Sequence, residues 1–565
     1  MEQVQTNSEL RDHRLNARSY LLLAMFALAV FLPGLFDLPP IDRDEARFVQ
    51  ASRQMMESGD YVDIRFQEES RYKKPVGIYW LQVAVAQVHG GGADAPIWVF
   101  RLVSLTGAVV AVLLTAWAAA GLFGARAGFL AALLLLGCLL LGVEARLAKT
   151  DAVLLACVVL AQGSLARLYL AARSGAGIGY GNALLFWLAM GVALLVKGPI
   201  APLICGLTLV TLGFWERRWR WMLALRPLIG GLLASVIVLP WLLAVSLQSG
   251  GAFLEESLGG DLLAKLFQGQ ESHGAPPGYY LLSFWIAAWP FGFLALVGLL
   301  AAWQRRSDPA VRFCLAWLLP SWVVFELVMT KLPHYTLPLY PAIFLLLAGY
   351  LRGTIAAPEK TRWRPAVKVG WILQAVLSLL LIAAVIVVPP IAGGGGFNGW
   401  SLMAAAAVAV AGILSCGPFT DQAKLRTRPE RRVGILLAAG FLFYLGAYQG
   451  MLPRMSALWL SPQIARAVES LRPCPDSRLA AAGYTEPSLA ILVGTNTLLG
   501  SAEAAAAYLI ESPKCGIAVV ESRAEASFMA ALSENGVNVD ALTSLSGINY
   551  SRGQQVTLTF YRIRQ

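Results

Sequence analysis

Apolar runs of about 20 residues recur along most of this chain, which matches the length that a helix needs to cross a bilayer. Only 14% of the 565 residues are charged, whereas soluble proteins average about 25%. The chain therefore has too little polar surface for a water-exposed body. The pattern predicts an α-helical polytopic membrane protein of 13 spans, near residues 19–38, 97–118, 124–143, 152–172, 182–197, 199–215, 221–245, 278–302, 311–329, 336–352, 367–388, 400–416 and 433–450.

The basic residues behind the net charge of +11 fall in short clusters between these runs. Cytoplasmic loops are enriched in Lys and Arg, and a cytoplasmic N-terminus makes alternate connections basic. We expect a bacterial inner-membrane protein with an uncleaved first span, and no nucleic-acid binding. The residues that set this orientation are Arg126, Arg167, Arg173, Arg217, Arg218, Arg220, Arg305, Arg306, Arg352, Lys360, Arg362, Arg364, Lys424, Arg426, Arg428, Arg431 and Arg432.

The other connections are expected on the periplasmic side, and the longest covers residues 39–96. Its apolar stretch 75–84 is short and ends at three glycines. Short apolar helices with aromatic rings suit the membrane interface, and a fourteenth span would invert the charge pattern. We therefore expect an interfacial helix. The remaining periplasmic connections are 144–151, 246–277, 330–335 and 389–399.

The composition changes after Leu452, which predicts a transmembrane domain over 1–452 and a periplasmic α/β domain over 453–565. A periplasmic location permits disulfides, so we expect Cys474 to pair with Cys515. The cysteines show no CxxC or His-spaced pattern, so no zinc site is predicted. The elements expected in this domain are strands at 489–493, 515–520 and 555–561 and helices at 502–511 and 524–535.

Five charged clusters fall on the periplasmic connections, where an ionisable residue is a candidate for function. Carboxylates, cations and tyrosines on one face favour a single site that binds a lipid-linked phosphate and orients an acceptor. The clusters are Asp42–Arg47, Arg71–Pro75, Glu144–Asp151, Glu271–His273 and Lys331–Tyr335.

Structural explanations exist for several charged residues, both inside and outside these clusters. Asp44 would fit as the N-cap of a helix over Glu45–Met56, and the cations of the Arg71 cluster would suit lipid headgroups. Lys197 would suit the C-terminus of a helix. Arg101 would snorkel to the interface from the start of a span.

The order of these motifs resembles the bacterial GT-C glycosyltransferases related to protein O-mannosyltransferases, and within them the lipid A aminoarabinose transferases. The resemblance covers most of the membrane region. It rests on Asp44-Glu45, Tyr72–Trp80 with its Lys-Pro step, Arg146–Asp151, Leu195–Pro199, and Lys331–Tyr335 followed by Pro338 and Pro341.

The resemblance implies an inverting glycosyltransferase that moves a sugar from a polyprenyl (undecaprenyl) phosphate carrier to a periplasmic-side acceptor such as lipid A. No cofactor is implied. Asp44 would be the main catalytic acidic residue, and Glu45 would support it. Asp151 would be a second acidic residue of the site, held by Arg146 or Lys149. The implied substrate-binding residues are Arg47, Tyr72, Lys73, Lys74, Arg146, Lys149, His273, Lys331, His334 and Tyr335.

Two departures leave the sugar open. Lys73 stands where aminoarabinose transferases have an acidic residue before the lysine, and Pro75-Val76 replaces Pro-Pro. Because that acidic residue helps to hold a metal in such enzymes, no metal is expected here. Alternative functions are a protein O-mannosyltransferase-like enzyme, a transporter or flippase of lipid-linked sugars, and an inactive scaffold. The absence of an internal repeat in the sequence argues against a transporter.

Overall fold

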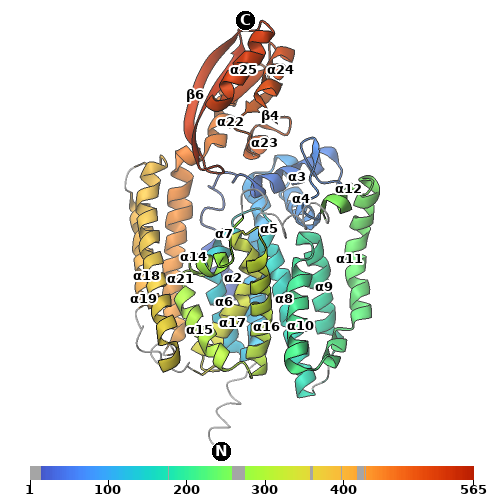
Figure 1. Ribbon diagram of the computed structural model, residues 1–565, viewed down its shortest axis with the longest axis vertical. Coiled ribbons are helices and arrows are strands. Elements are labelled where there is room, and N and C mark those ends of the chain that lie inside the picture. The colour runs from blue at the N-terminus through green and yellow to red at the C-terminus, as the bar shows by residue number, and fades with distance from the viewer. Residues whose placement is uncertain are drawn as a thin grey trace, which may run out of the picture.

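The computed structural model describes residues 14–564, apart from 176, 178, 258–273, 357–359, 396–397, 417–425 and 427. A bundle of helices carries a small α/β domain at one end, and the N-terminus lies at the other end (Figure 1). Hereafter the first end is called the domain face and the second the opposite face.

Within the described residues, eight helical segments are long and apolar enough to cross a membrane. Five shorter apolar helices accompany them, and together they lie at the thirteen predicted positions, which confirms the predicted class of fold. The long segments are α5 (Ile97–Phe123), α8 (Asp151–Ser174), α9 (Tyr180–Lys197), α11 (Pro227–Gln248), α16 (Pro309–Leu327), η4 (Pro333–Leu339) with α17 (Tyr340–Leu351), α18 (Lys360–Ile391), and α21 (Pro429–Tyr444) with η5 (Leu445–Met451) and η6 (Leu452–Arg454); the shorter ones are α2 (Ala17–Phe31), α6 (Ala125–Leu136), α10 (Ile200–Glu216), α15 (Gly292–Gln304) and α19 (Gly399–Cys416).

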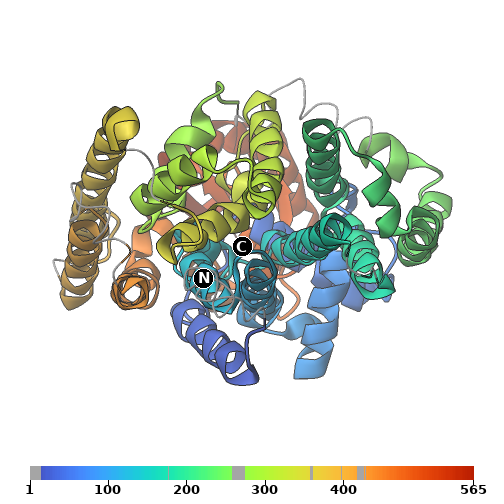
Figure 2. The same cartoon turned by 90° about the horizontal axis from the view of Figure 1, so that it is seen from below.

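The interior of the bundle is formed by α5, α6, α8 and α17. Every residue of α17 is buried. Viewed along the bundle, α18 and α19 lie at one flank, and α9 to α11 lie at the other (Figure 2). The flanking helices carry many of the exposed large apolar side chains, such as Leu228, Leu247 and Leu379, as expected for helices that face lipid.

Two of the predicted spans are interrupted, and their interruptions lie against each other. One span consists of α6 and α7 (Leu139–Glu144), separated at Gly137, and the other of α14 (Tyr279–Ala287) and α15, separated around Pro290. The Leu139 amide donates to the Trp289 carbonyl at 3.0 Å. Broken helices are tolerated in membranes when other protein groups satisfy the freed backbone.

The predicted interfacial connection forms a helical layer on the domain face. It contains α3 (Asp44–Ser58), a two-stranded ribbon of β1 (Arg65–Phe66) and β2 (Glu69–Ser70), α4 (Gly77–His89) and η1 (Gly92–Asp94). The short α12 (Ala252–Leu254) lies near α4 at this face (Figure 1).

The C-terminal domain is a five-stranded sheet of order β4-β3-β5-β7-β6 with helices on both faces. The first three strands in this order are parallel, and β7 and β6 form an antiparallel hairpin. The elements are α22 (Leu460–Leu471), β3 (Leu479–Ala482), α23 (Ser488–Val493), β4 (Leu498–Gly500), α24 (Ala502–Glu511), β5 (Ile517–Glu521), α25 (Ser522–Glu534), β6 (Val539–Asn549) and β7 (Gln554–Ile563).

Four of the five elements predicted for this domain are confirmed as β5, β7, α24 and α25. The strand predicted at 489–493 is wrong, because these residues form α23. A short apolar run does not distinguish a buried helix from a buried strand. Here Leu489 packs within the domain, and Ile491 packs against the layer that contains α3.

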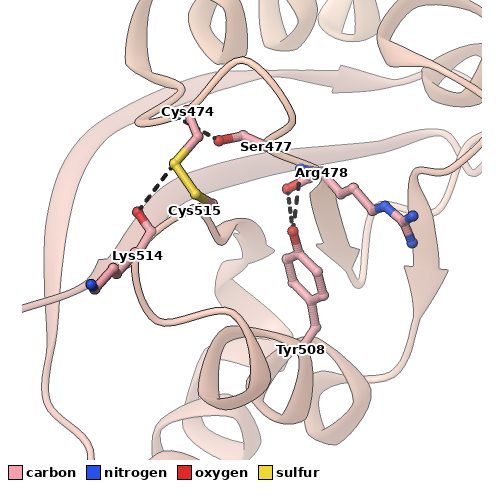
Figure 3. Close-up of a disulfide and its surroundings, with 6 residues drawn as sticks. All are labelled: Cys474, Ser477, Arg478, Tyr508, Lys514 and Cys515. Atoms are coloured by element: carbon pink, nitrogen blue, oxygen red, sulfur yellow. Dashed lines mark hydrogen bonds between the residues drawn. A yellow bond between two sulfur atoms is a disulfide. The ribbon is translucent and has the colours of Figure 1, made fainter.

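The predicted disulfide between Cys474 and Cys515 is present, with the two Cα atoms 5.3 Å apart (Figure 3). It joins the segment before β3 to the segment before β5. Beside it, the Tyr508 hydroxyl donates to the Arg478 carbonyl at 2.9 Å and accepts from the Arg478 amide at 3.2 Å. The bridge therefore fastens the start of two adjacent parallel strands.

Candidate active site

Five charged or titratable residues from three stretches of the chain meet at the domain face and are called the charge cluster: Glu144, Lys149, Asp151, Lys197 and His334. Lys149 Nζ lies 3.1 Å from Glu144 Oε2, and Lys197 Nζ lies 2.5 Å from Asp151 Oδ1. His334 lies between the two acids, with Nδ1 3.8 Å from Glu144 and Nε2 4.0 Å from Asp151. Acids and cations thus alternate in one buried network.

The breaks between helices bring these residues together. Glu144 ends α7 and Asp151 begins α8, so the short connection between them carries Lys149. Lys197 is the last residue of α9. His334 lies in η4, which packs against both α7 and α8.

Asp44 is the first residue of α3 and is half-buried beside the charge cluster. Burial raises the pKa of its carboxyl, but Lys149, His334, Arg71 and Lys74 lower it, and the net direction is downward. This downward shift favours an ionised Asp44 carboxylate beside the cations Lys149, Arg71 and Lys74. Because its own helix starts at Asp44, the N-terminal helix dipole also favours the negative charge.

The cation Lys149 is held charged by its surroundings. Burial alone would lower its pKa, but Glu144, Asp151 and Asp44 raise it above the ordinary value. Its backbone is fixed as well, because the Ser104 hydroxyl donates to its carbonyl at 3.0 Å. Lys149 therefore presents a permanent positive charge between three carboxylates.

Arg71 and Lys74 approach the same region from the segment between β2 and α4. Arg71 is buried, and its guanidinium lies 5.2 Å from the centre of the Phe48 ring on α3. Lys74 Nζ donates to the Lys73 carbonyl at 2.9 Å. Lys73 itself is exposed. Both Arg71 and Lys74 act electrostatically on Asp44, so the positive charge around Asp44 comes from several segments.

Glu45 is occupied by structural partners. It is 1% exposed and forms a two-point ion pair with the buried Arg101, at 2.9 Å for each contact. Its oxygens also accept from the amides of Ile41 and Ala148 at 2.9 and 2.8 Å. Glu45 thus fixes the start of α3 against the connection that carries Lys149.

Arg101 does not snorkel to the interface, contrary to the structural explanation considered from the sequence. It is fully buried and donates to the carbonyls of Leu35, Leu38 and Pro39 as well as to Glu45. The bend that follows α2 is therefore built around this one guanidinium.

The resemblance implied that Asp151 is held by Arg146 or Lys149, but Arg146 does not contact Asp151. Its fully buried guanidinium donates to the carbonyls of Pro33, Val30 and Gly142. It also lies 4.7 and 4.6 Å from the rings of Tyr444 and Tyr448. The cation that contacts Asp151 is Lys197 instead, whose Nζ lies 2.5 Å from Asp151 Oδ1.

The remaining candidates are Tyr335, Tyr72, Lys331, Arg47 and His273. Tyr335 belongs to the site, because Lys197 Nζ lies 5.5 Å from the centre of its ring. Tyr72 and Lys331 have structural partners: Tyr72 donates to Asp63 at 2.8 Å, and Lys331 donates to the carbonyls of Ala275 and Val328. Arg47 is half-buried on α3. The last candidate, His273, lies outside the described residues.

Lys197 and Arg71 were not among the site residues proposed from the sequence. Lys197 had been explained as a helix-terminal cation, because its partner Asp151 lies 46 positions earlier in the chain. A signal was nevertheless present, since a lone lysine at the end of an apolar helix leaves a charge that needs a partner. Arg71 belongs to one of the five charged clusters, for which both lipid headgroups and one particular phosphate are candidate ligands, but the resemblance gives it no individual role.

Among the residues that the structure describes, no three His, Cys, Asp or Glu side chains are grouped so that they would hold a metal ion. The acids of the charge cluster alternate with Lys149 and Lys197, so the local charge is already balanced by the protein.

Comparison with known proteins gives one match to a protein-family model and several similar proteins. Residues 73–243 match the family described as dolichyl-phosphate-mannose-protein mannosyltransferase. The chain is 28% identical over 310 residues to the undecaprenyl phosphate-α-4-amino-4-deoxy-L-arabinose arabinosyl transferase of Erwinia tasmaniensis, with 54% of each chain covered. It is 31% identical over 345 residues to a protein of the same name from Pseudomonas fluorescens, with 59% of each covered. The chain thus spans less than two thirds of the length of these relatives.

The structural comparison covers nearly the whole chain. The crystal structure of ArnT from Cupriavidus metallidurans bound to undecaprenyl phosphate matches with a TM-score of 0.72, at 19% identity and over 96% of this chain and 98% of that one. The resemblance to GT-C membrane glycosyltransferases predicted from the sequence is thereby confirmed. Within that class, the fold is that of ArnT.

Proposed function

We propose that this protein is an inverting glycosyltransferase that takes a sugar from a polyprenyl-phosphate carrier and transfers it to an acceptor at the domain face. The observation that carries the proposal is the position of Asp44, an ionised and half-buried carboxylate among Lys149, His334, Arg71 and Lys74. The names of the relatives and the mannosyltransferase module over 73–243 support the same reaction class.

The proposed donor is an undecaprenyl phosphate-linked sugar, and Lys74 is the proposed ligand of its phosphate. The phosphate gains negative charge as the glycosidic bond breaks, so cations placed beforehand stabilise the transition state more than the ground state. Tyr335 and Lys197 would form the neighbouring wall of the site.

The reaction is a single displacement. An acceptor oxygen attacks the anomeric carbon of the sugar while the bond from that carbon to the phosphate oxygen breaks, and the polyprenyl phosphate leaves with the bonding electrons. For a hydroxyl acceptor, Asp44 accepts the proton. For an acceptor that is already ionised, such as a phosphate, Asp44 instead orients the sugar and no base is needed.

The proposed location is the bacterial inner membrane, with the domain face in the periplasm. The basic connections Arg217–Arg220 and Arg305-Arg306 lie at the opposite face, which carries the N-terminus (Figure 1). Enrichment of Lys and Arg marks the cytoplasmic side. The disulfide in the C-terminal domain supports this orientation, because disulfides persist in the periplasm and are rare in the cytosol.

Lipid A is the proposed acceptor, since the relatives that match over 54% to 63% of the chain are aminoarabinose transferases. A periplasmic protein hydroxyl is the second candidate, because the matching family model is that of protein mannosyltransferases. Lys73, a cation directly before the proposed phosphate ligand, keeps neutral and acidic sugars among the candidate donors beside an amino sugar.

The test uses the full chain in lipid nanodiscs with synthetic undecaprenyl phosphate sugars, namely aminoarabinose, mannose and a uronic acid, and lipid A as acceptor. We expect transfer by the wild type and a loss of at least about 100-fold in kcat for Asp44→Asn. Lys74→Ala should raise KM for the donor and lower kcat as well. Asp540→Asn, a change of a half-buried carboxylate on β6 that pairs with Arg564 within the C-terminal domain, is the matched control and should leave turnover unchanged.

Two outcomes would contradict the proposal, and a third would change its acceptor. Unchanged turnover in both Asp44→Asn and Lys74→Ala would refute the site. Movement of a labelled donor across sealed vesicles without any transfer product would indicate a transporter. No transfer to lipid A but transfer to a peptide hydroxyl would change the acceptor to the second candidate.

A further inference from the structure

The backbone directly before Asp44 has a conformation that a side chain disfavours. Arg43 has φ 67° and ψ −112°, which corresponds to the first central position of a type II′ turn, where glycine is preferred. A non-glycine residue keeps such a conformation only where its surroundings enforce it, and such residues gather at functional sites. The question is therefore what holds Arg43.

The groups that hold this segment come from the C-terminal domain, about 500 positions later in the chain. The Asp42 amide donates to the Tyr550 hydroxyl at 2.8 Å, and the Arg43 guanidinium donates to the Ser551 carbonyl. The Ser488 amide donates to Asp42 Oδ1 at 3.2 Å. Two of these three contacts come from the turn between β6 and β7, residues 550–553.

Tyr550 is itself fixed within this arrangement. Its ring packs edge-on against Trp459, with the ring centres 5.9 Å apart. Trp459 Nε1 in turn donates to the Leu452 carbonyl at the end of the bundle at 2.6 Å. The hydroxyl of Tyr550 is therefore anchored to the bundle and is not carried on a free loop.

The other end of α3 is held by the same domain through α23 and the residues that follow it. Arg53 Nη1 donates to the Ile491 carbonyl at 2.7 Å, and Gln50 Nε2 donates to Thr495 Oγ1 at 2.7 Å. The C-terminal domain thus contacts the helix of Asp44 along its length as well as at its start.

We propose that the turn 550–553 positions Asp44 by holding Arg43 in its strained backbone conformation, with Tyr550 as a positioning residue for transfer. This inference rests on the proposed function of Asp44. Because Arg43 immediately precedes Asp44, a relaxation of φ at Arg43 would rotate the first turn of α3 and move the carboxylate away from Lys149 and Lys74. The C-terminal domain would then contribute to the geometry of the site by holding the residue before Asp44.

The test compares Tyr550→Phe with wild type in the nanodisc assay. Phe keeps the ring that packs on Trp459 and removes only the hydroxyl that accepts from Asp42. We expect kcat to fall about tenfold, the rate equivalent of one lost hydrogen bond, while KM for the donor changes less than about twofold. The matched control is Tyr561→Phe, a buried tyrosine of β7 whose hydroxyl bonds Glu525 within the domain; its kcat should be unchanged.

A rescue variant separates positioning from a general loss of structure. Glycine adopts φ 67° without strain, so Arg43→Gly combined with Tyr550→Phe should recover at least about threefold in kcat over Tyr550→Phe alone. An additive further loss in the double variant would overturn the proposal, as would equal losses of kcat in Tyr550→Phe and Tyr561→Phe.

A second measurement does not depend on activity. Hydrogen exchange of the peptide that covers residues 41–47 should become faster in Tyr550→Phe and stay at the wild-type rate in Tyr561→Phe. If the wild type transfers no sugar, the proposed function fails, and the exchange comparison still tests the positioning. Unchanged exchange at 41–47 in Tyr550→Phe would overturn the positioning even if the enzyme is active.

Discussion

Asp42 gives the contact between the C-terminal domain and the bundle a dependence on pH. Its carboxyl is 7% exposed. Burial, together with the neighbouring Glu486, raises its pKa from 3.8 to about 6, although hydrogen bonds from Ser488 and Tyr550 oppose the increase. Tyr484 also faces the Asp42 carboxyl, and Glu486 accepts from Asn549 at 3.0 Å.

The sign follows from proton binding in the two states. A docked Asp42 binds its proton more tightly than an Asp42 exposed by opening of the contact, so docking is strongest below pH 4 and weakens as the pH rises through about 6. The difference between 3.8 and about 6, at 1.36 kcal/mol for each unit of pKa, corresponds to about 3 kcal/mol. Opening should therefore be on the order of 100-fold more frequent at pH 7.5 than at pH 4.

The perturbation that tests this reasoning is Asp42→Asn, whose amide stays neutral at every pH and still accepts from Ser488. The assay is hydrogen exchange of peptides from α23, corrected for the intrinsic pH dependence of exchange and measured between pH 4 and 7.5. In the wild type the free energy of opening should fall by up to about 3 kcal/mol over this range. In Asp42→Asn it should be nearly constant, so that the variant is better protected at pH 7.5.

Glu57→Gln is the matched control. Glu57 is exposed and accepts from Thr495 across the same contact, so its removal should leave the pH dependence of the wild type in place. An Asp42→Asn variant that loses protection between pH 4 and 7.5 as steeply as the wild type would refute the assignment of this dependence to Asp42.

Three further predictions concern buried pairs and the disulfide. Lys197→Met removes the only cation described in direct contact with the buried Asp151 and should destabilise the protein by about 3 kcal/mol or more in thermal unfolding followed by tryptophan fluorescence, whereas Lys197→Arg should retain much of that stability. Glu45→Gln weakens the pairing of the fully buried Arg101 and should lower thermal stability by about 2 kcal/mol or more; equal stability of the variant and wild type would contradict the structural role of Glu45. Cys474→Ser opens a bridge across 41 positions and should destabilise the C-terminal domain by about 3 kcal/mol, measured as faster hydrogen exchange in β3 and β5, with no change in the bundle.

The positions of the apolar helices were predictable from the sequence because the length and composition of a spanning helix are set by the bilayer, not by neighbouring helices. The interruptions at Gly137 and Pro290 were not predicted, because each run is apolar throughout and has the pattern of one continuous span. A backbone hydrogen bond joins the two facing breaks and satisfies part of the freed backbone. This arrangement depends on tertiary packing.

The residues of the candidate site were predictable as a group but not as pairs. The charged residues of the connections predicted as periplasmic were expected on one face, and Glu144, Lys149, Asp151 and His334 do meet there. The partner of Asp151 was assigned to nearby positions in the sequence, Arg146 or Lys149. The structure pairs it with Lys197, because the end of α9 lies beside the start of α8.

The hydrogen-bond partners of the charged residues at the domain face distinguish structural residues from candidate site residues more clearly than their burial does. The guanidinium groups of Arg101 and Arg146 donate to carbonyls that follow or end α2, where the helix leaves acceptors without partners. Such a cation satisfies the backbone around it, and a substrate phosphate would have to compete with those carbonyls. Asp44 differs, since it is half-buried and its ionised state depends on cations from several separate segments. A carboxylate held in this way keeps its charge, which its proposed role in transfer requires.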